Sequence, residues 1–288
     1  MFRIAAMPDQ QPIFSQLSSL TPYGAACRSV TSPLAGRAKI ELQLVDIDVG
    51  LLLESVLDIV KTMGMSGWRH KDGESNLYGG FSLTYNPDHQ DGLDPHVSTL
   101  GTPKNDAKQF FFAATSTHAN LKNSYFDTYG FRTRTEASKF GYLGRFIDSF
   151  SRSMIRSRVG IVLGENVDPN DQSYKQNAGW HRDEPVFENM RVNIPLQTDD
   201  NYVFQMEADA PYHLEVGKAY TWDTNRPHRV FATGRSSVKR IHLVLGFAPW
   251  FDYHPATDAW APNAYFGRMH PFDMAAQGHF SPHLRLAH

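Results

Sequence analysis

The sequence predicts a mainly β protein with flanking helices, whose core is a sandwich or barrel of short strands. Short runs rich in Val, Ile, Tyr and Phe recur between residues 158 and 248, with turn residues between them. No long helical pattern and no repeat of fixed period interrupts these runs, which disfavours an alternating β/α design and a solenoid. The predicted strands lie in RVGIVLGE, MRVNIPLQ, NYVFQME, YHLEVG, AYTWDT, HRVFAT and RIHLVLGFA.

The first part of the chain predicts an irregular arm, then a strand, a helix and loops. Residues 1–37 lack sustained periodicity, so we expect an arm lying over the surface. Alternation in IELQLV (40–45) predicts a half-buried strand, and the spacing of apolar residues in DVGLLLESVLDIVKTMG predicts a helix directly after it. Residues 66–106 are rich in Gly, Asp, Asn and Pro, which indicates long loops with one short strand.

A second helix is predicted over residues 135–154, in TEASKFGYLGRFIDSFSRSM, with Thr135 as its N-cap. Its apolar residues recur at spacings of three and four: Phe140, Leu143, Phe146, Ile147 and Phe150. We therefore expect one domain over residues 38–288. It would comprise an α/β and loop-rich part (38–155), the strand-rich core (156–250) and a C-terminal segment (251–288) that wraps the core.

Composition limits the partners and the setting of this 288-residue chain. A formal net charge of -2 provides no bulk positive field for nucleic acid or anionic lipid, so neither is expected as a partner. The single cysteine, Cys27, excludes an intramolecular disulfide or a cysteine-rich metal site within one chain, which fits a reducing, cytoplasmic setting. No apolar run approaches the roughly 20 residues that span a bilayer, so we expect a soluble protein.

The segment GWHRDEPVF contains the most informative pattern, because His181 and Asp183 are two residues apart. Residues i and i+2 of an extended strand point to the same face, so this imidazole and carboxylate would aim at one point. His228, which follows a proline in TNRPHRVFA, begins another predicted strand. Two histidines and one carboxylate on one face of a metal ion leave three positions open, as non-haem Fe(II) oxygenases require. An isolated H-x-D pattern often arises by chance, so the prediction depends on this context.

Arg240 begins the apolar strand in KRIHLVLGFA, twelve residues after His228. If it faces inward, its planar guanidinium would need an anion, and a carboxylate matches it with two parallel hydrogen bonds. The alternative is an exposed charge at a strand end. Arg191 and Asn193 share a face in MRVNIPL and could contact the same oxoacid or a substrate carboxylate. Both could equally face solvent.

These residues resemble the aspartyl/asparaginyl β-hydroxylase-like branch of the Fe(II)/2-oxoglutarate-dependent dioxygenases. The resemblance spans about residues 156–252 and rests on WHRDEPVFENMRVNIPL, LEVGKAYTWDTNRPHRVFA and RIHLVLGFAPW. It implies a double-stranded β-helix, a jelly-roll and cupin-like fold. It also implies that His181 and His228 bind iron and that Arg240 binds the distal carboxylate of 2-oxoglutarate. Arg191 and Asn193 would lie near 2-oxoglutarate, although the family often has histidine at the position of Asn193.

The resemblance implies an enzyme with Fe(II) as cofactor and 2-oxoglutarate and O2 as co-substrates. We expect hydroxylation of an unactivated C–H bond in an amino acid or an amino-acid-derived small molecule, with release of succinate and CO2. Asp183 completes the triad and argues against a halogenase, because halogenating relatives have a small residue there. The loops from 66 to 130 are the expected source of substrate contacts, and the polar candidates there are Tyr85, Asn86, His96 and Arg132.

Three alternatives to a small-molecule hydroxylase remain open. One is a hydroxylase of Asp or Asn side chains in a polypeptide, and another is a cupin-like protein that binds a ligand without turnover. The third is a zinc hydrolase that uses the same ligands. It would need a general base beside the metal-bound water, and only Glu184 is near in sequence. Adjacent strand residues point to opposite faces, so we expect Glu184 to face away from the metal.

Overall fold

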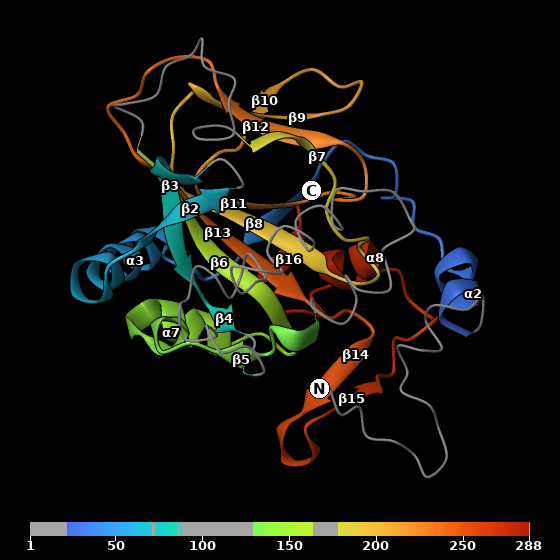
Figure 1. The fold of residues 1–288 in the computed structure, drawn as a ribbon. Helices are drawn as coiled ribbons and strands as arrows, with labels where there is room; N and C mark the ends of the chain where they lie inside the picture. Colours follow the sequence, from blue (N-terminus) through green and yellow to red (C-terminus); the bar gives the residue numbers. More distant parts are fainter. Residues whose placement is uncertain (1–21, 71–72, 86, 88–128, 164–177, 288) are drawn as a thin grey trace.

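Two antiparallel sheets of unequal size form the centre of the protein (Figure 1). The computed structural model describes residues 22–70, 73–85, 87, 129–163 and 178–287. The larger sheet has the strand order β16 (Leu284–Leu286), β1 (Ile40–Leu44), β11 (Lys218–Thr221), β8 (Met190–Gln197), β13 (Arg240–Phe247), β6 (Met154–Val162), β3 (Gly73–Ser82) and β2 (Ser66–His70). The smaller sheet has the order β10 (Tyr212–His213), β9 (Tyr202–Met206), β12 (His228–Ala232) and β7 (Ala178–His181).

The chain passes back and forth between these two sheets from β6 to β13. β6, β8, β11 and β13 belong to the larger sheet, whereas β7, β9, β10 and β12 belong to the smaller one. This alternation winds the strands into a double-stranded β-helix, or jelly roll. The predicted fold class is therefore confirmed, and each of the seven predicted segments contributes a strand.

Helices cover the outer face of the larger sheet. α3 (Val49–Met63) follows β1, as predicted, and packs against α7 (Gly141–Asp148) and β8. The Asp48 side chain caps α3 by accepting a hydrogen bond from the backbone N–H of Leu51 at 3.1 Å. Gly64 ends the helix with a positive φ of 79°, a backbone conformation that glycine adopts without strain.

The largest apolar cluster includes residues of these helices and of the strands beneath them. Every second residue of β13 belongs to it, namely Ile241, Leu243, Leu245 and Phe247. The helices contribute Leu52, Val56, Ile59, Leu143, Phe146 and Ile147. Successive strand residues alternate between faces, so the other face of β13, with Arg240 and His242, is turned toward the smaller sheet. Much of the apolar core thus lies outside the space between the sheets.

The second predicted helix is shorter than expected and has a different cap. The 3-10 helix η2 (Ala137–Lys139) precedes α7, and Thr135 accepts a hydrogen bond from the backbone of Ser138 at 3.3 Å instead of capping α7. The backbone N–H of Tyr142 donates to Ser55 of α3, at 3.1 Å. A side chain distant in sequence therefore caps α7, and local spacing could not indicate this.

For the described part of the region from 66 to 106, the prediction of loops with one short strand is wrong; residues 88–106 lie outside the described residues. Its described part forms the hairpin β2–β3 and a short strand, β4 (Thr84–Tyr85), which pairs with β5 (Thr133–Arg134). Gly80 of β3 lies opposite Gly160 of β6, and a Cβ at Gly80 would come within 1.9 Å of the carbonyl oxygen of Val159. Glycine is here a requirement of close strand pairing and not a sign of a loop.

The terminal segments add further elements around the sheets. Residues 22–29 of the predicted irregular arm form a helix, α2 (Pro22–Ser29), which corrects that prediction, and residues 1–21 lie outside the described part. The C-terminal segment contains the hairpin β14 (Phe251–His254) and β15 (Ala259–Pro262), the turn η4 (Pro255–Thr257) and α8 (Pro271–Ala276). β16 then pairs with β1 at the edge of the larger sheet. Within the described ranges, no helix has the length and apolar character needed to cross a bilayer.

Replacing Leu243 by alanine tests the core on the helical side of β13. Leu243 is fully buried, so Leu243→Ala should lower the free energy of unfolding by about 2–5 kcal/mol. Leu57→Ala, at a helix position that is 42% exposed, should stay within about 0.5 kcal/mol of the parent. Urea unfolding followed by tryptophan fluorescence measures both. Equal losses in the two variants would contradict this assignment of the core.

Candidate metal centre and pocket

Two histidines meet where β7 pairs with β12. His181 is the last residue of β7, His228 is the first of β12, and the two are direct partners in the antiparallel register. Their ring centroids are 4.3 Å apart. The aromatic rings of Phe204 and Trp222 pack beside the imidazole of His228, with centroids 5.8 and 6.0 Å from the imidazole centroid. The pairing of two strands thus fixes the separation of the imidazoles.

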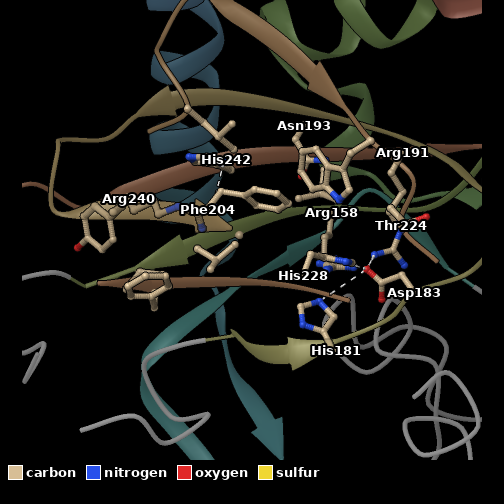
Figure 2. A pocket seen from close by; sticks show the side chains of 18 of the residues that line it. Arg158, His181, Asp183, Arg191, Asn193, Phe204, Thr224, His228, Arg240 and His242 are labelled. Carbon is tan, nitrogen blue, oxygen red and sulfur yellow. Dashed lines mark hydrogen bonds and ion pairs between the residues drawn. The ribbon is translucent and has the colours of Figure 1, made fainter. Parts of the chain in front are cut away.

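Asp183 completes a group of three side chains that could hold a metal ion (Figure 2). Its Oδ2 lies 3.4 Å from Nε2 of His228 and 3.8 Å from Nε2 of His181. The three potential ligand atoms all lie within 4.8 Å of one another. β7 ends at His181, so Asp183 does not share a strand with it as predicted; instead, its backbone N–H donates to the carbonyl of Thr224 at 2.8 Å.

The hydrogen bonding of His228 suits metal binding. Its Nδ1 lies 2.9 Å from the backbone carbonyl of Arg226, and a carbonyl only accepts, so Nδ1 bears the proton. The lone pair of Nε2 then faces Asp183 and His181. A hydrogen bond of this kind, from the ring nitrogen that does not bind the metal to a carbonyl, fixes the tautomer in many metal-binding histidines. Two imidazoles and one carboxylate that converge in this way fit a divalent transition metal.

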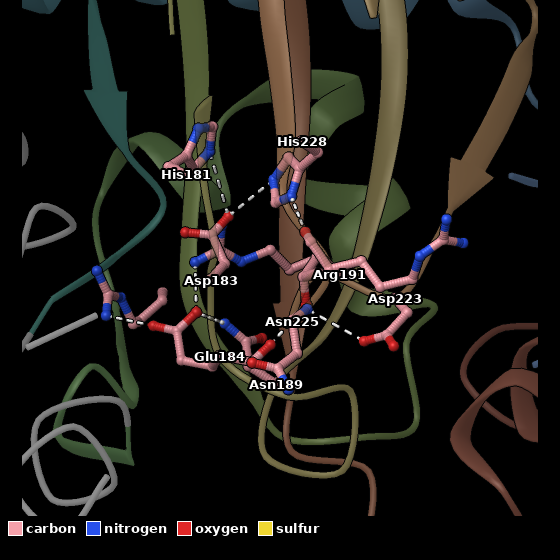
Figure 3. A network of polar contacts seen from close by, with 11 residues as sticks. His181, Asp183, Glu184, Asn189, Arg191, Asp223, Asn225 and His228 are labelled. Carbon is pink, nitrogen blue, oxygen red and sulfur yellow. Dashed lines mark hydrogen bonds and ion pairs between the residues drawn. The ribbon is translucent and has the colours of Figure 1, made fainter. Parts of the chain in front are cut away.

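A chain of buried ion pairs supports Asp183 (Figure 3). Arg191 of β8 donates from Nη1 to Oδ2 of Asp183 and from Nη2 to Oε2 of Glu184, the latter at 2.6 Å. Arg156 of β6 donates to the other oxygen of Glu184. Glu184 is only 3% exposed and does not line the pocket, in line with the expectation that it faces away from the metal. Arg191 therefore links the larger sheet to Asp183, the candidate metal ligand.

The opposite charges of these buried ion pairs stabilise one another in their ionised forms. Burial by itself would raise the pKa of Asp183, but the guanidinium of Arg191 holds that pKa well below its usual range. Burial likewise opposes ionisation of Glu184, yet Arg156 and Arg191 bring its pKa below the ordinary value. The pKa of Arg191 is raised, because its two carboxylate partners outweigh its burial. Each carboxylate is thus held in the ionised form.

Arg156 and Glu184 are site residues that sequence reasoning did not connect. Arg156 has a left-handed backbone, with φ 43°, where the register of β6 with β13 shifts. A bulge of this kind changes the direction of a side chain next to a functional site. The acidic neighbour in H-R-D-E was the available signal, because a second carboxylate beside a metal ligand needs a cation when it is buried.

The candidate metal centre opens into a pocket between the two sheets. The pocket has a volume of about 810 Å³, part of it open to solvent. The larger sheet lines it with Arg158, Gly160, Val162, Arg191, Asn193, Arg240, His242 and Val244, and Trp222 lies directly after β11. Residues of the smaller sheet and its loops that line it include His181, Asp183, Tyr202, Phe204, Leu214 and His228. Polar groups thus converge in a partly apolar cleft, as in many small-molecule sites.

The other predicted site residues differ in whether they line the pocket. Arg240 and Asn193 line the pocket, whereas both Nη atoms of Arg191 contact carboxylates. Arg132 does not line the pocket but donates to Asp258 from Nε at 3.2 Å and Nη2 at 2.8 Å. Tyr85 of β4 is also absent from the lining. The structure therefore gives no support for substrate contacts by Arg132 or Tyr85.

Two further predicted residues, Asn86 and His96, lie outside the described residues. Arg158 and His242 line the pocket and were not singled out from the sequence. The signal for His242 was present, because strand residues two apart share a face and Arg240 was already expected to point inward.

Comparison with known proteins gives structural likenesses only. Neither a protein-family model nor a curated protein matches the sequence. The non-haem α-ketoglutarate-dependent epimerase SnoN of nogalamycin biosynthesis is 10% identical, with a TM-score of 0.38; the match covers 82% of this chain and 81% of that chain. A prolyl-4-hydroxylase from Pseudomonas putida is 11% identical, with a TM-score of 0.35 and coverage of 74% and 94%.

A further match, to a structure in a study of the DMSP lyases RdDddP and RnDddQII, is 17% identical with a TM-score of 0.24. It covers 34% of this chain and 40% of that chain. All three TM-scores lie below 0.5, so the function has to be inferred from the chemistry of the site itself. The resemblance to the aspartyl/asparaginyl β-hydroxylase-like branch stays a prediction.

Replacing Glu184 by glutamine tests the ion-pair chain. Glu184→Gln keeps the shape of the side chain but leaves Arg156 and Arg191 with one buried carboxylate fewer. We expect a loss of about 3–5 kcal/mol in the free energy of unfolding, because a buried charge loses its partner. Urea denaturation of the metal-free protein measures it.

The matched control for this measurement is Glu215→Gln. The Glu215 side chain is exposed and pairs with Lys218 at the surface, so its loss should leave stability nearly unchanged. If the Glu184→Gln variant is as stable as the Glu215→Gln variant, the buried ion pairs of Glu184 contribute nothing to the free energy of unfolding.

Proposed function

We propose that this protein is an Fe(II)- and 2-oxoglutarate-dependent dioxygenase. It would hydroxylate an unactivated C–H bond of an amino acid or an amino-acid-derived small molecule, with release of succinate and CO2. The observation that supports the proposal is the convergence of His181, Asp183 and His228 beside a pocket that also contains Arg240. Figure 2 shows Arg240 at the end of the pocket away from the three candidate ligands.

The residues present fit this chemistry. His181, Asp183 and His228 would hold the iron and leave the remaining coordination positions open. Bound iron would supply dioxygen activation coupled to oxidative decarboxylation of 2-oxoglutarate. Arg240 would bind the distal carboxylate of the co-substrate, and its permanent charge and planar group suit that task. Phe204, Leu214 and Trp222 would help to exclude water from the space between the sheets.

Arg191 and Asn193 take different roles in this proposal. Both Nη atoms of Arg191 contact carboxylates, so we assign it the positioning of Asp183 in preference to the binding of 2-oxoglutarate. Asn193 lines the pocket and remains a proposed contact of the co-substrate or the substrate. An amide can donate to and accept from a ligand, which suits either partner.

The alternatives differ in what they require of the same pocket. A zinc hydrolase would need Glu184 as a general base, but Glu184 is buried between Arg156 and Arg191. Those contacts hold Glu184 ionised and immobile behind Asp183. They therefore disfavour the zinc hydrolase, whose general base has to exchange a proton beside the metal. A hydroxylase of Asp or Asn side chains in a polypeptide would use the same centre with a larger substrate. A non-catalytic cupin-like protein would bind a ligand without producing succinate.

Anaerobic addition of Fe(II) and 2-oxoglutarate tests the proposal. The wild type should develop a weak visible charge-transfer band from the bidentate complex, and His181→Ala should abolish it. Arg240→Ala should weaken 2-oxoglutarate binding by about 30-fold or more, because it removes the cation of a charge-assisted pair. Arg229→Ala is a matched control: Arg229 lies next to His228 in β12 but contacts Gln205 and Trp180 outside the pocket.

A wild type without the band, or a band that His181→Ala and Arg240→Ala leave unchanged, would refute the proposed function. The substrate class is then addressed by succinate release over a panel of amino acids and of peptides containing Asp or Asn. Release stimulated by free amino acids supports the small-molecule assignment. Release stimulated only by peptides supports the polypeptide alternative.

A further inference from the structure

The pocket face of β13 brings a second polar side chain beside Arg240. Arg240 and His242 are two residues apart on the strand, and both line the pocket. In the neighbouring strands, Gly160 of β6 and Pro195 of β8 lie opposite His242. Directly opposite residues share a face, and glycine has no side chain, so Gly160 leaves space beside the imidazole.

The contact between the two side chains fixes the tautomer of His242. Nη2 of Arg240 lies 3.1 Å from Nδ1 of His242. A guanidinium group has donors only, so Nδ1 must accept the hydrogen bond. A neutral imidazole that accepts at Nδ1 bears its proton on Nε2. His242 therefore presents an N–H donor from Nε2.

That donor has no partner in the described part of the chain. His242 is 2% exposed, and its Nε2 makes no hydrogen bond to any described residue. Burial, together with the positive charge of Arg240, holds the pKa of His242 well below its usual range, so the ring is neutral. A buried N–H without an acceptor is unfavourable, and such groups in native proteins nearly always have a partner.

We propose that His242 is the second donor of the carboxylate site formed by Arg240, and that it confers selectivity for an oxoacid with a distal carboxylate. This inference rests on the proposed function. A carboxylate has about four acceptor positions, so it can accept from the guanidinium and from Nε2 of His242 together. A cationic ligand group would be repelled by Arg240. An apolar group would leave the N–H unsatisfied, which discriminates strongly against a ligand that lacks the acceptor.

A matched pair of variants and a matched pair of ligands test the role of His242. Glutamine and methionine have similar length, but only glutamine keeps an N–H donor. 2-Oxoglutarate and 2-oxovalerate share the oxoacid end, but only 2-oxoglutarate has the distal carboxylate. Binding of each ligand to the Fe(II)-loaded proteins is measured anaerobically by calorimetry, with direct titration of 2-oxoglutarate and competition for 2-oxovalerate. Urea unfolding of each variant verifies that it folds.

We expect His242→Met to weaken 2-oxoglutarate binding by about 10- to 100-fold, the usual effect of losing one hydrogen bond to a charged group. His242→Gln should bind 2-oxoglutarate within about 5-fold of the wild type, because the donor is retained. Both variants should bind 2-oxovalerate within about 2-fold of the wild type, because that ligand lacks the acceptor. This pattern would locate the contact of His242 at the distal carboxylate.

Three results would overturn the inference, and they are distinguishable. If His242→Met weakens both ligands equally, the role of His242 is to maintain the shape of the pocket. If His242→Met leaves 2-oxoglutarate binding unchanged, a water molecule and not the co-substrate satisfies Nε2. If the wild type binds neither ligand, the proposed function itself fails, and the assignment of His242 fails with it.

Discussion

The antiparallel pairing of β7 with β12 is the interaction on which the candidate metal centre depends. His181 and His228 are direct partners in that pairing, so the backbone hydrogen bonds of two strands hold two potential ligands at a fixed separation. β12 also pairs with β9 along its whole length, which ties the ligand pair to the rest of the smaller sheet. Metal sites built on strands are held more rigidly than sites on loops. The third ligand lacks this support, because Asp183 lies beyond the end of β7.

Ion pairs hold Asp183 in place, because this residue lies outside the strand. Arg191 reaches Asp183 from the larger sheet, and Glu184 and Arg156 extend the contact into a chain of alternating charges. The two carboxylates and two guanidinium groups balance one another, so the chain can be buried without a net charge. Buried ion pairs add little stability relative to apolar packing, but they are directional. We infer that these ion pairs fix the orientation of Asp183 and couple the two sheets at the candidate metal centre.

The sequence predicted the strands, and it singled out three candidate ligand residues that lie together in the structure, because both inferences depend on local patterns. Runs of β-branched and aromatic residues between turns identified the jelly roll, and His228 and Arg240 stood at the beginnings of strands, as expected. The end of β7 before Asp183 and the bulge at Arg156 could not be predicted, since backbone hydrogen bonds between distant segments determine them. The beginning of α7 likewise depends on Ser55, which lies in another helix. These three errors arose where a tertiary contact outweighed the local pattern.

The location of the apolar core explains how one sheet can serve both stability and chemistry. One face of β13 packs Leu243 and Leu245 beneath the helices, and the other presents Arg240 and His242 to the pocket. The helices shield the first face from water, so the fold does not need the space between the sheets for all of its apolar burial. Polar side chains can therefore line that space at low cost to the fold, provided that they pair with one another or with a ligand. Substitutions on the inner face should then alter binding more than folding, except in the buried ion-pair chain, where both depend on the same contacts.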